Sequence, residues 1–178
     1  MHLYRPKVPV CVAMGCSGVA LAIQLAAVIG TGWMVYKNTY SVYSYFSEEG
    51  LFRYCKEITE ICYTYDERKG PSDWAKYCQL FSILSLGAMF SSCLLGILHI
   101  FRQETQALTH LAAGVNGVAV VYIAVEVGVF AGETKDMVID TASLTVSYGY
   151  CFYLSIVAGV LSVVTAILYV VGRVPVRQ

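Results

Sequence analysis

Two cysteines, seven positions apart, are the side chains in this sequence best suited to covalent chemistry. Cys55 and Cys62 lie in the polar segment 32–77. Such a pair forms a disulfide in an oxidising compartment, or binds zinc when further ligands are close. The histidines, which would be the usual additional zinc ligands, all lie outside this segment: His2, His99 and His110. We therefore expect no metal and no cofactor, and a disulfide if the segment faces an oxidising compartment.

A second candidate is Glu126, the one acidic side chain well inside a long apolar run. Membrane carboxylates usually face the bundle interior and find a partner there. At 1.5 Å per residue, Gln24 reaches a similar depth, and Tyr150 and Tyr153 begin the last apolar run at a comparable level. We expect an intramembrane polar cluster of Glu126, Gln24 and one of the two tyrosines; proton or ion handling is the alternative.

Catalysis has little support in the sequence. No histidine falls in segment 32–77, no second acid accompanies Glu126, and no Gly-rich phosphate loop is present. Binding of nucleic acid through a basic field is also excluded, because 12 Lys and Arg residues balance 12 Asp and Glu residues. We expect a protein that is not an enzyme.

Four long stretches with almost no charge must position these residues. The 178-residue chain is 57% hydrophobic and 13% charged, and the charged share is about half that of an ordinary soluble domain. About 20 apolar residues cross a bilayer core of about 30 Å. The sequence predicts an all-α transmembrane protein, a left-handed four-helix bundle, although the first run could instead be a cleaved signal sequence. The four predicted spans are Val8–Thr31, Cys78–His99, Ala107–Ala131 and Tyr148–Gly172.

Short basic segments beside the spans predict their orientation. An even number of spans puts both chain ends, together with the connection 100–106, on one side. That side carries five basic residues and one acid: Arg5, Lys7, Arg102, Arg173, Arg177 and Glu104. By the positive-inside rule, we expect both termini in the cytosol and the segments 32–77 and 132–147 outside the plasma membrane. Cys55 and Cys62 then face an oxidising compartment, where a disulfide is expected.

The longer outer segment is rich in tyrosine and β-branched residues, which favour strands. Residues 51–55 and 61–65 are further candidate strands after a turn at 47–50, and residues 68–72 break the pattern. We expect a small antiparallel β-sheet in the first outer loop; the alternative is an unstructured, tyrosine-rich loop. The stretch 35–46 predicts one strand with a face formed by Tyr36, Asn38, Tyr40, Val42, Ser44 and Phe46.

Six residues of this region resemble a known family pattern. The sequence resembles the W…GLW…C…C pattern of claudins, peripheral myelin protein, epithelial membrane proteins, lens-fibre membrane protein and calcium-channel γ subunits. The motif around Cys55 looks most like the lens-fibre branch, and 147–154 resembles the start of the fourth span in the myelin and epithelial branches. The residues that carry the pattern are Trp33, Gly50, Leu51, Phe52, Cys55 and Cys62.

The resemblance implies a claudin-like fold in which Trp33 and the Leu51–Phe52 pair pack the sheet onto the bundle. An ordinary belt of interfacial aromatics is the alternative. The sequence departs from the family pattern where Phe52 stands in place of Trp. It also has no Asn-x-Ser/Thr site, and its tail, 173–178, lacks the Tyr-Val ending of many claudins.

Small residues recur every fourth position in three of the spans. Such ridges let helices approach closely in lipid, so we expect them to pack within the bundle, with a lateral homo-oligomer as the alternative. The ridges are Gly18, Ala22, Ala26 and Gly30; Ala88, Ser92 and Gly96; and Ala158, Ser162 and Ala166.

The combined features favour a structural membrane protein. We expect a role in cell–cell contact, junction formation or membrane organisation, with the lipid bilayer and other membrane proteins as partners. An auxiliary subunit of an ion channel, similar to the γ-subunit branch, is the second hypothesis. A paracellular or transmembrane ion pathway is the third.

Overall fold

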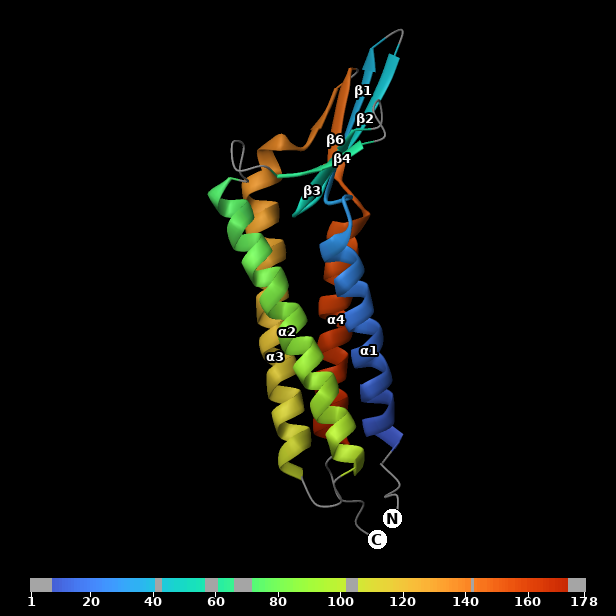
Figure 1. The fold of residues 1–178 in the computed structure, drawn as a ribbon, viewed down its shortest axis with the longest axis vertical. Helices are drawn as coiled ribbons and strands as arrows, with labels where there is room; N and C mark the ends of the chain where they lie inside the picture. The colour runs from blue at the N-terminus through green and yellow to red at the C-terminus, as the bar shows by residue number, and fades with distance from the viewer. Residues whose placement is uncertain are drawn as a thin grey trace.

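The computed structural model shows a long helical bundle with a β-sheet standing at one end (Figure 1). It describes residues 8–40, 43–56, 61–65, 72–101, 106–141 and 143–172. The charges that predict orientation, at positions 5, 7, 102, 104, 173 and 177, lie outside these ranges, as does most of the predicted break at 68–72.

Four helices of the described chain are long and apolar enough to cross a membrane. They are α1 (Val8–Ile29), α2 (Asp73–Phe101), α3 (Gln106–Thr134) and α4 (Tyr150–Val171). The helix α2 starts five residues before the predicted span. The prediction missed its first turn because that turn carries the exposed ion pair of Lys76 and Asp73, and the span was predicted from apolar residues alone. At 1.5 Å per residue, the shorter helices α1 and α4 extend about 33 Å.

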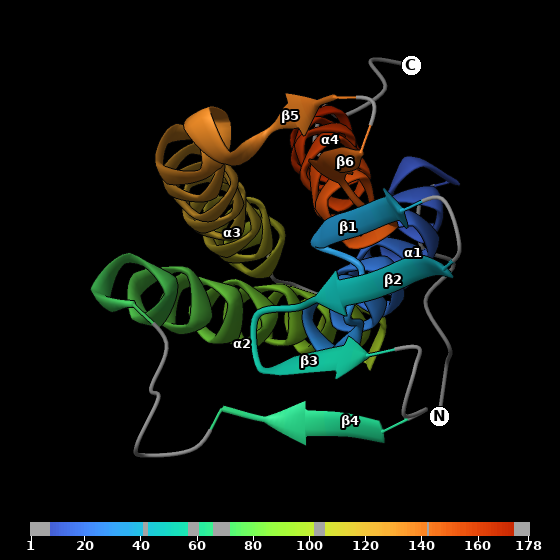
Figure 2. The same cartoon turned by 90° about the horizontal axis from the view of Figure 1, so that it is seen from above.

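The helices surround a common centre in the order α1, α2, α3, α4 (Figure 2). The closest packing is between α2 and α3 and between α1 and α4, whereas α1 and α2 contact each other much less. The helices α1 and α3 therefore lie diagonally across the bundle. The start of α1 and the end of α4 lie at the end away from the sheet (Figure 1).

The sheet is antiparallel throughout, with described strands in the order β4-β3-β2-β1-β6-β5. Its strands are β1 (Met34–Tyr40), β2 (Tyr43–Glu49), β3 (Arg53–Lys56), β4 (Ile61–Thr64), β5 (Ile139–Asp140) and β6 (Leu144–Tyr148). A single 3-10 turn, η3 (Lys135–Met137), connects α3 to β5. Placing the whole sheet in the first outer loop was incomplete, because β5 and β6 belong to the connection between α3 and α4. Tyr148, assigned to the fourth span, ends β6.

The tyrosine-rich stretch forms a hairpin instead of one strand. The strands β1 and β2 pair antiparallel, with Tyr36 opposite Ser47 and Lys37 opposite Phe46. Residues opposite one another share a face of the sheet. Phe46 therefore lies on the face of Lys37, and the predicted continuous face from Tyr36 to Phe46 is wrong. Residues 41–42, which include Val42, lie outside the described residues.

The predicted turn at 47–50 is also displaced. Residues 47–49 complete β2, where Glu49 pairs with Met34 on one side and with Tyr54 on the other. Backbone pairing on both sides outweighs the low strand propensity of glutamate. The chain reverses at Gly50–Phe52, and Gly50 N donates to Arg53 O at 2.8 Å.

Candidate functional site

A cross-strand disulfide joins the two outermost strands on one side of the sheet. Cys55 of β3 stands opposite Cys62 of β4, and their sulfurs are bonded, with the two Cα atoms 4.1 Å apart. The predicted disulfide is confirmed. It ties the outermost strand on this side, β4, to the rest of the sheet.

Trp33 joins the sheet to the bundle. Its side chain is fully buried, and Nε1 donates to the Ala27 carbonyl of α1 at 2.7 Å. Its ring meets Phe130 of α3 edge-on at 4.9 Å and Phe152 of α4 at 6.2 Å. Its backbone N donates to Glu49 O at 3.0 Å. One side chain thus contacts three helices where β1 begins, which differs from a lipid-facing aromatic belt.

The Gly50–Phe52 turn is held against the helices. Leu51 is buried in the same apolar cluster as Trp33, with Phe52 packed against its edge. Gln79 of α2 donates from Nε2 to Leu51 O at 2.6 Å. A Cβ on Gly50 would lie 2.5 Å from the Gly30 carbonyl, so only glycine permits this approach. The Gly50–Phe52 turn therefore connects the sheet to the end of α1 and to α2.

Glu126 lies at a polar centre to which all four helices contribute. Gln24 of α1 donates from Nε2 to Glu126 Oε2 at 3.2 Å and to Ser85 Oγ at 3.4 Å. Ser82 Oγ lies 2.5 Å from Glu126 Oε1, and Ser155 of α4 donates to Gln24 Oε1 at 3.1 Å. All five side chains have 0% exposure. The structure thus brings Glu126 and Gln24 together.

Neither of the two candidate tyrosines, of which one was expected as a partner, joins this centre. Tyr150 is 53% exposed and Tyr153 is 56% exposed. The inner face of α4 passes instead through Cys151, Ser155 and Ala158, which follow one another at helical spacing. Ser155, three positions before the ridge residue Ala158, could have been found from that spacing. The sequence gives the depth of a residue along its helix, but which side of the helix faces the centre is known only from the packed bundle.

Hydrogen-bond counting favours a neutral Glu126 side chain. Ser82 has one hydroxyl proton, yet its Oγ lies 2.8 Å from the Cys78 carbonyl and 2.5 Å from Glu126 Oε1. If Glu126 is a neutral acid, its proton lies between Oε1 and Ser82, and Ser82 donates to Cys78 O. Every side-chain polar atom of this five-residue centre then has a partner, which a dry interior demands.

The small-residue ridges divide between the inside and the outside of the bundle. On α2, Ser92 is buried and donates to Ala112 O at 3.0 Å. On α4, the buried Ser162 carbonyl accepts from Asn116 Nδ2 at 2.6 Å. For the first ridge the expected packing is wrong at Gly18, Ala22 and Ala26, which are exposed, whereas Gly30 lies close against Cys151 of α4. The inner face of α1 carries Ser17, Ala20 and Gln24 instead.

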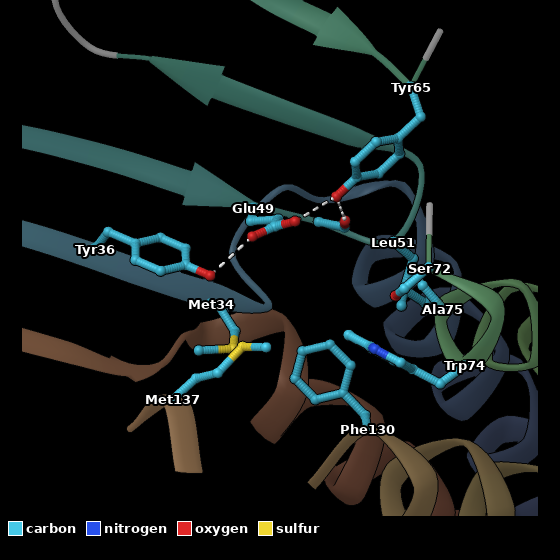
Figure 3. Close-up of a pocket in the computed structure, with 11 residues that line it drawn as sticks. Met34, Tyr36, Glu49, Leu51, Tyr65, Ser72, Trp74, Ala75, Phe130 and Met137 are labelled. Atoms are coloured by element: carbon cyan, nitrogen blue, oxygen red, sulfur yellow. Dashed lines mark hydrogen bonds between the residues drawn. The ribbon is translucent and has the colours of Figure 1, made fainter. Parts of the chain in front are cut away.

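A cavity of about 310 Å³ lies between the sheet and the ends of α2 and α3 (Figure 3). The hydroxyls of Tyr36 and Tyr65 donate to the two oxygens of Glu49 at 2.9 and 2.8 Å. Burial, followed by the charge and hydrogen bond of Glu49, raises the pKa of each tyrosine. The opposite wall holds Trp74 and Phe130, whose ring centroids are 5.8 Å apart. Sequence reasoning missed this site, because its walls come from segments far apart in the chain.

Comparisons with known proteins leave these features to be interpreted on their own. A scan against protein-family models and a search of curated proteins found no match to this sequence.

Proposed function

We propose that this protein is a four-span membrane protein without catalytic activity. The observation that carries the proposal is an inverted polarity: the bundle buries polar side chains and exposes large apolar ones. In a water-soluble bundle the apolar stripe faces inward. The outward-facing apolar residues include Val19, Leu25, Ile83, Phe90, Val121, Val160 and Ile167, and the buried polar ones include Gln24, Ser82, Asn116, Glu126 and Ser162. Lipid is the solvent that suits this arrangement.

The sheet then projects from one membrane surface as the recognition element. Its outermost described strands, β4 and β5, offer unpaired backbone groups to a partner. Tyr63 on β4 is exposed and stacks on Tyr54 at 5.4 Å, and tyrosines supply contact area at low entropic cost. The disulfide restrains this edge. We propose that the sheet acts outside the plasma membrane in cell–cell contact, junction formation or membrane organisation, as the resemblance to claudins and their relatives implies.

Topology is tested by tagging each terminus and Lys135 of η3 in intact and permeabilised cells. Terminal tags should react with antibody only after permeabilisation, and the tag at Lys135 should react in intact cells. The reverse pattern would place the sheet in the cytosol and overturn the proposal.

Contact formation is tested with mixed fluorescently labelled cells. The protein should concentrate where two expressing cells meet, and Cys55→Ser should reduce this while surface expression is retained. Cys11→Ser changes an exposed thiol on α1 and serves as the matched control. Uniform surface distribution of the unmodified protein would overturn the contact role. Co-purification with a channel in mild detergent would then favour the auxiliary-subunit hypothesis.

A further inference from the structure

The cavity beneath the sheet has a built-in negative charge. Glu49 lies at its upper wall, and the hydroxyls of Tyr36 and Tyr65 point at its two oxygens (Figure 3). These donors are uncharged, so they orient the carboxylate without neutralising it. Within the part of the chain that the structure describes, the one salt bridge joins Lys76 and Asp73 on the exposed start of α2, and it does not involve Glu49.

Arg53, the basic residue that directly follows the Gly50–Phe52 turn, is directed elsewhere. Arg53 donates from Nη2 to the Ile29 carbonyl at 3.0 Å, at the end of α1. Glu49 is therefore a half-buried carboxylate with no cationic partner among the described residues. Removing a charge from water is costly unless an opposite charge or several hydrogen bonds compensate. A positively charged ligand would complete this site.

The remaining walls select what kind of cation fits. Trp74 and Phe130 form an aromatic wall, and Met34, Met137 and Leu51 complete an apolar lining. Aromatic faces attract cations, and they favour alkylated ammonium groups, which carry little water. Metal ions in proteins are usually held by several His, Cys, Asp or Glu side chains, and among the described residues no group of three or more of these side chains lies together. The volume of about 310 Å³ is at the lower end of small-molecule sites.

From these features we propose that the cavity binds an alkylated organic ammonium group of the choline type. Glu49 is its counter-ion, and Trp74 and Phe130 form the wall against its alkyl groups. The group can arrive as the headgroup of a lipid or as a free ammonium ion. The chemistry of recognition is the same for both sources, and it is independent of any role in cell contact.

The primary test compares choline with its uncharged carbon isostere, 3,3-dimethylbutanol. The purified full-length protein is placed in nanodiscs of phosphatidylglycerol, which lacks an ammonium group, and binding is followed by calorimetry and thermal unfolding. Choline should bind saturably and at least tenfold more tightly than the isostere. Equal binding of the two, or no choline binding, would overturn the proposal without any variant.

Two matched variants locate the binding site. Glu49→Gln should weaken choline binding at least tenfold. Glu48→Gln makes the same charge change at the neighbouring carboxylate, which accepts from Thr31 Oγ1 at 2.7 Å, and should leave choline binding unchanged. Trp74→Leu should reduce the preference for choline over ammonium. An equal effect of both glutamate variants would contradict a local site.

Phosphatidylcholine nanodiscs distinguish the two sources. If a lipid headgroup occupies the cavity, added choline should bind more weakly in these discs than in phosphatidylglycerol, and Glu49→Gln should abolish the difference. Equal binding in both discs would assign the site to a free ammonium ion.

A double-mutant cycle for thermal stability tests whether a basic residue of this chain is the counter-ion of Glu49. Strong coupling of Glu49 to Arg68 or Lys69 would overturn the ligand site.

Discussion

Gln24 of α1 donates to Glu126 of α3 across the diagonal of the bundle, with Nε2 3.2 Å from Oε2. The two residues are 102 positions apart, and both are fully buried. Ser82 and Ser155 complete the contact from α2 and α4. The amide of Gln24 and the carboxyl group of Glu126 thus link α1 and α3 to each other and to α2 and α4. A helix rotation that turned one of these side chains away from the centre would break its hydrogen bond.

The neutral form of Glu126 predicts which substitutions the bundle tolerates. Glu126→Gln can donate to Ser82 and accept from Gln24, so its unfolding free energy in detergent should stay within about 1 kcal/mol of the unmodified protein. Glu126→Leu leaves Gln24 without its main acceptor and should cost about 1–3 kcal/mol. Chemical unfolding of the two variants checks this. Equal destabilisation by both would show that a charged carboxylate is needed.

Loss of the disulfide should loosen the sheet edge more than the bundle. The bond closes a loop between positions 55 and 62, for which chain entropy predicts about 2.5 kcal/mol of stabilisation. In Cys55→Ser/Cys62→Ser, hydrogen exchange should rise first in β4 and β3, while helical circular dichroism persists. Cys78→Ser in the apolar cluster provides a contrast, because it removes a buried thiol far from the edge. Unchanged exchange in β4 would contradict this role.

Alkaline pH should destabilise the sheet through Tyr36 and Tyr65. The folded state raises the pKa of both hydroxyls above the ordinary value of about 10, through burial and through Glu49. Below about pH 10, both folded and unfolded chains hold these protons, so the contribution to stability is fully present. Above it, the unfolded chain releases protons that the folded chain retains, so stability falls as pH rises through the folded pKa. Unfolding measured between about pH 8 and 12 should show this decline, and Tyr36→Phe/Tyr65→Phe should flatten it.

Two helical glycines should respond in opposite ways to alanine. A Cβ on Gly18 meets nothing within 4 Å, so Gly18→Ala should raise helix stability by about 0.5–1 kcal/mol. A Cβ on Gly96 would lie 2.5 Å from Tyr169 Oη and 2.9 Å from Met14 Cγ. Gly96→Ala should therefore destabilise the bundle, by about 1–3 kcal/mol. Thermal unfolding in detergent compares the two; similar effects would place both glycines on one kind of surface.

Local patterns in the sequence were sufficient for several features. The four apolar helices follow from uninterrupted hydrophobic runs, since length and composition are properties of each segment alone. Cys55 and Cys62 are the two cysteines in the segment between the first two runs, so their pairing needed no knowledge of the fold. The common depth of Gln24 and Glu126 follows from the constant rise of a helix.

Other features depended on how the segments pack. The strand β6 was missed because Leu144–Tyr148 is short and pairs with β1, more than a hundred positions earlier. Tyr150 and Tyr153 have the right depth but the wrong face, which only helix rotation decides. The cavity under the sheet requires Glu49, Trp74 and Phe130 to meet from three separate elements. The sequence by itself determined which segments are helical and which cysteines pair, because these follow from local composition. Tertiary structure alone decided which polar groups meet, because hydrogen bonds act over about 3 Å, whereas sequence patterns specify neither rotation nor distant pairing.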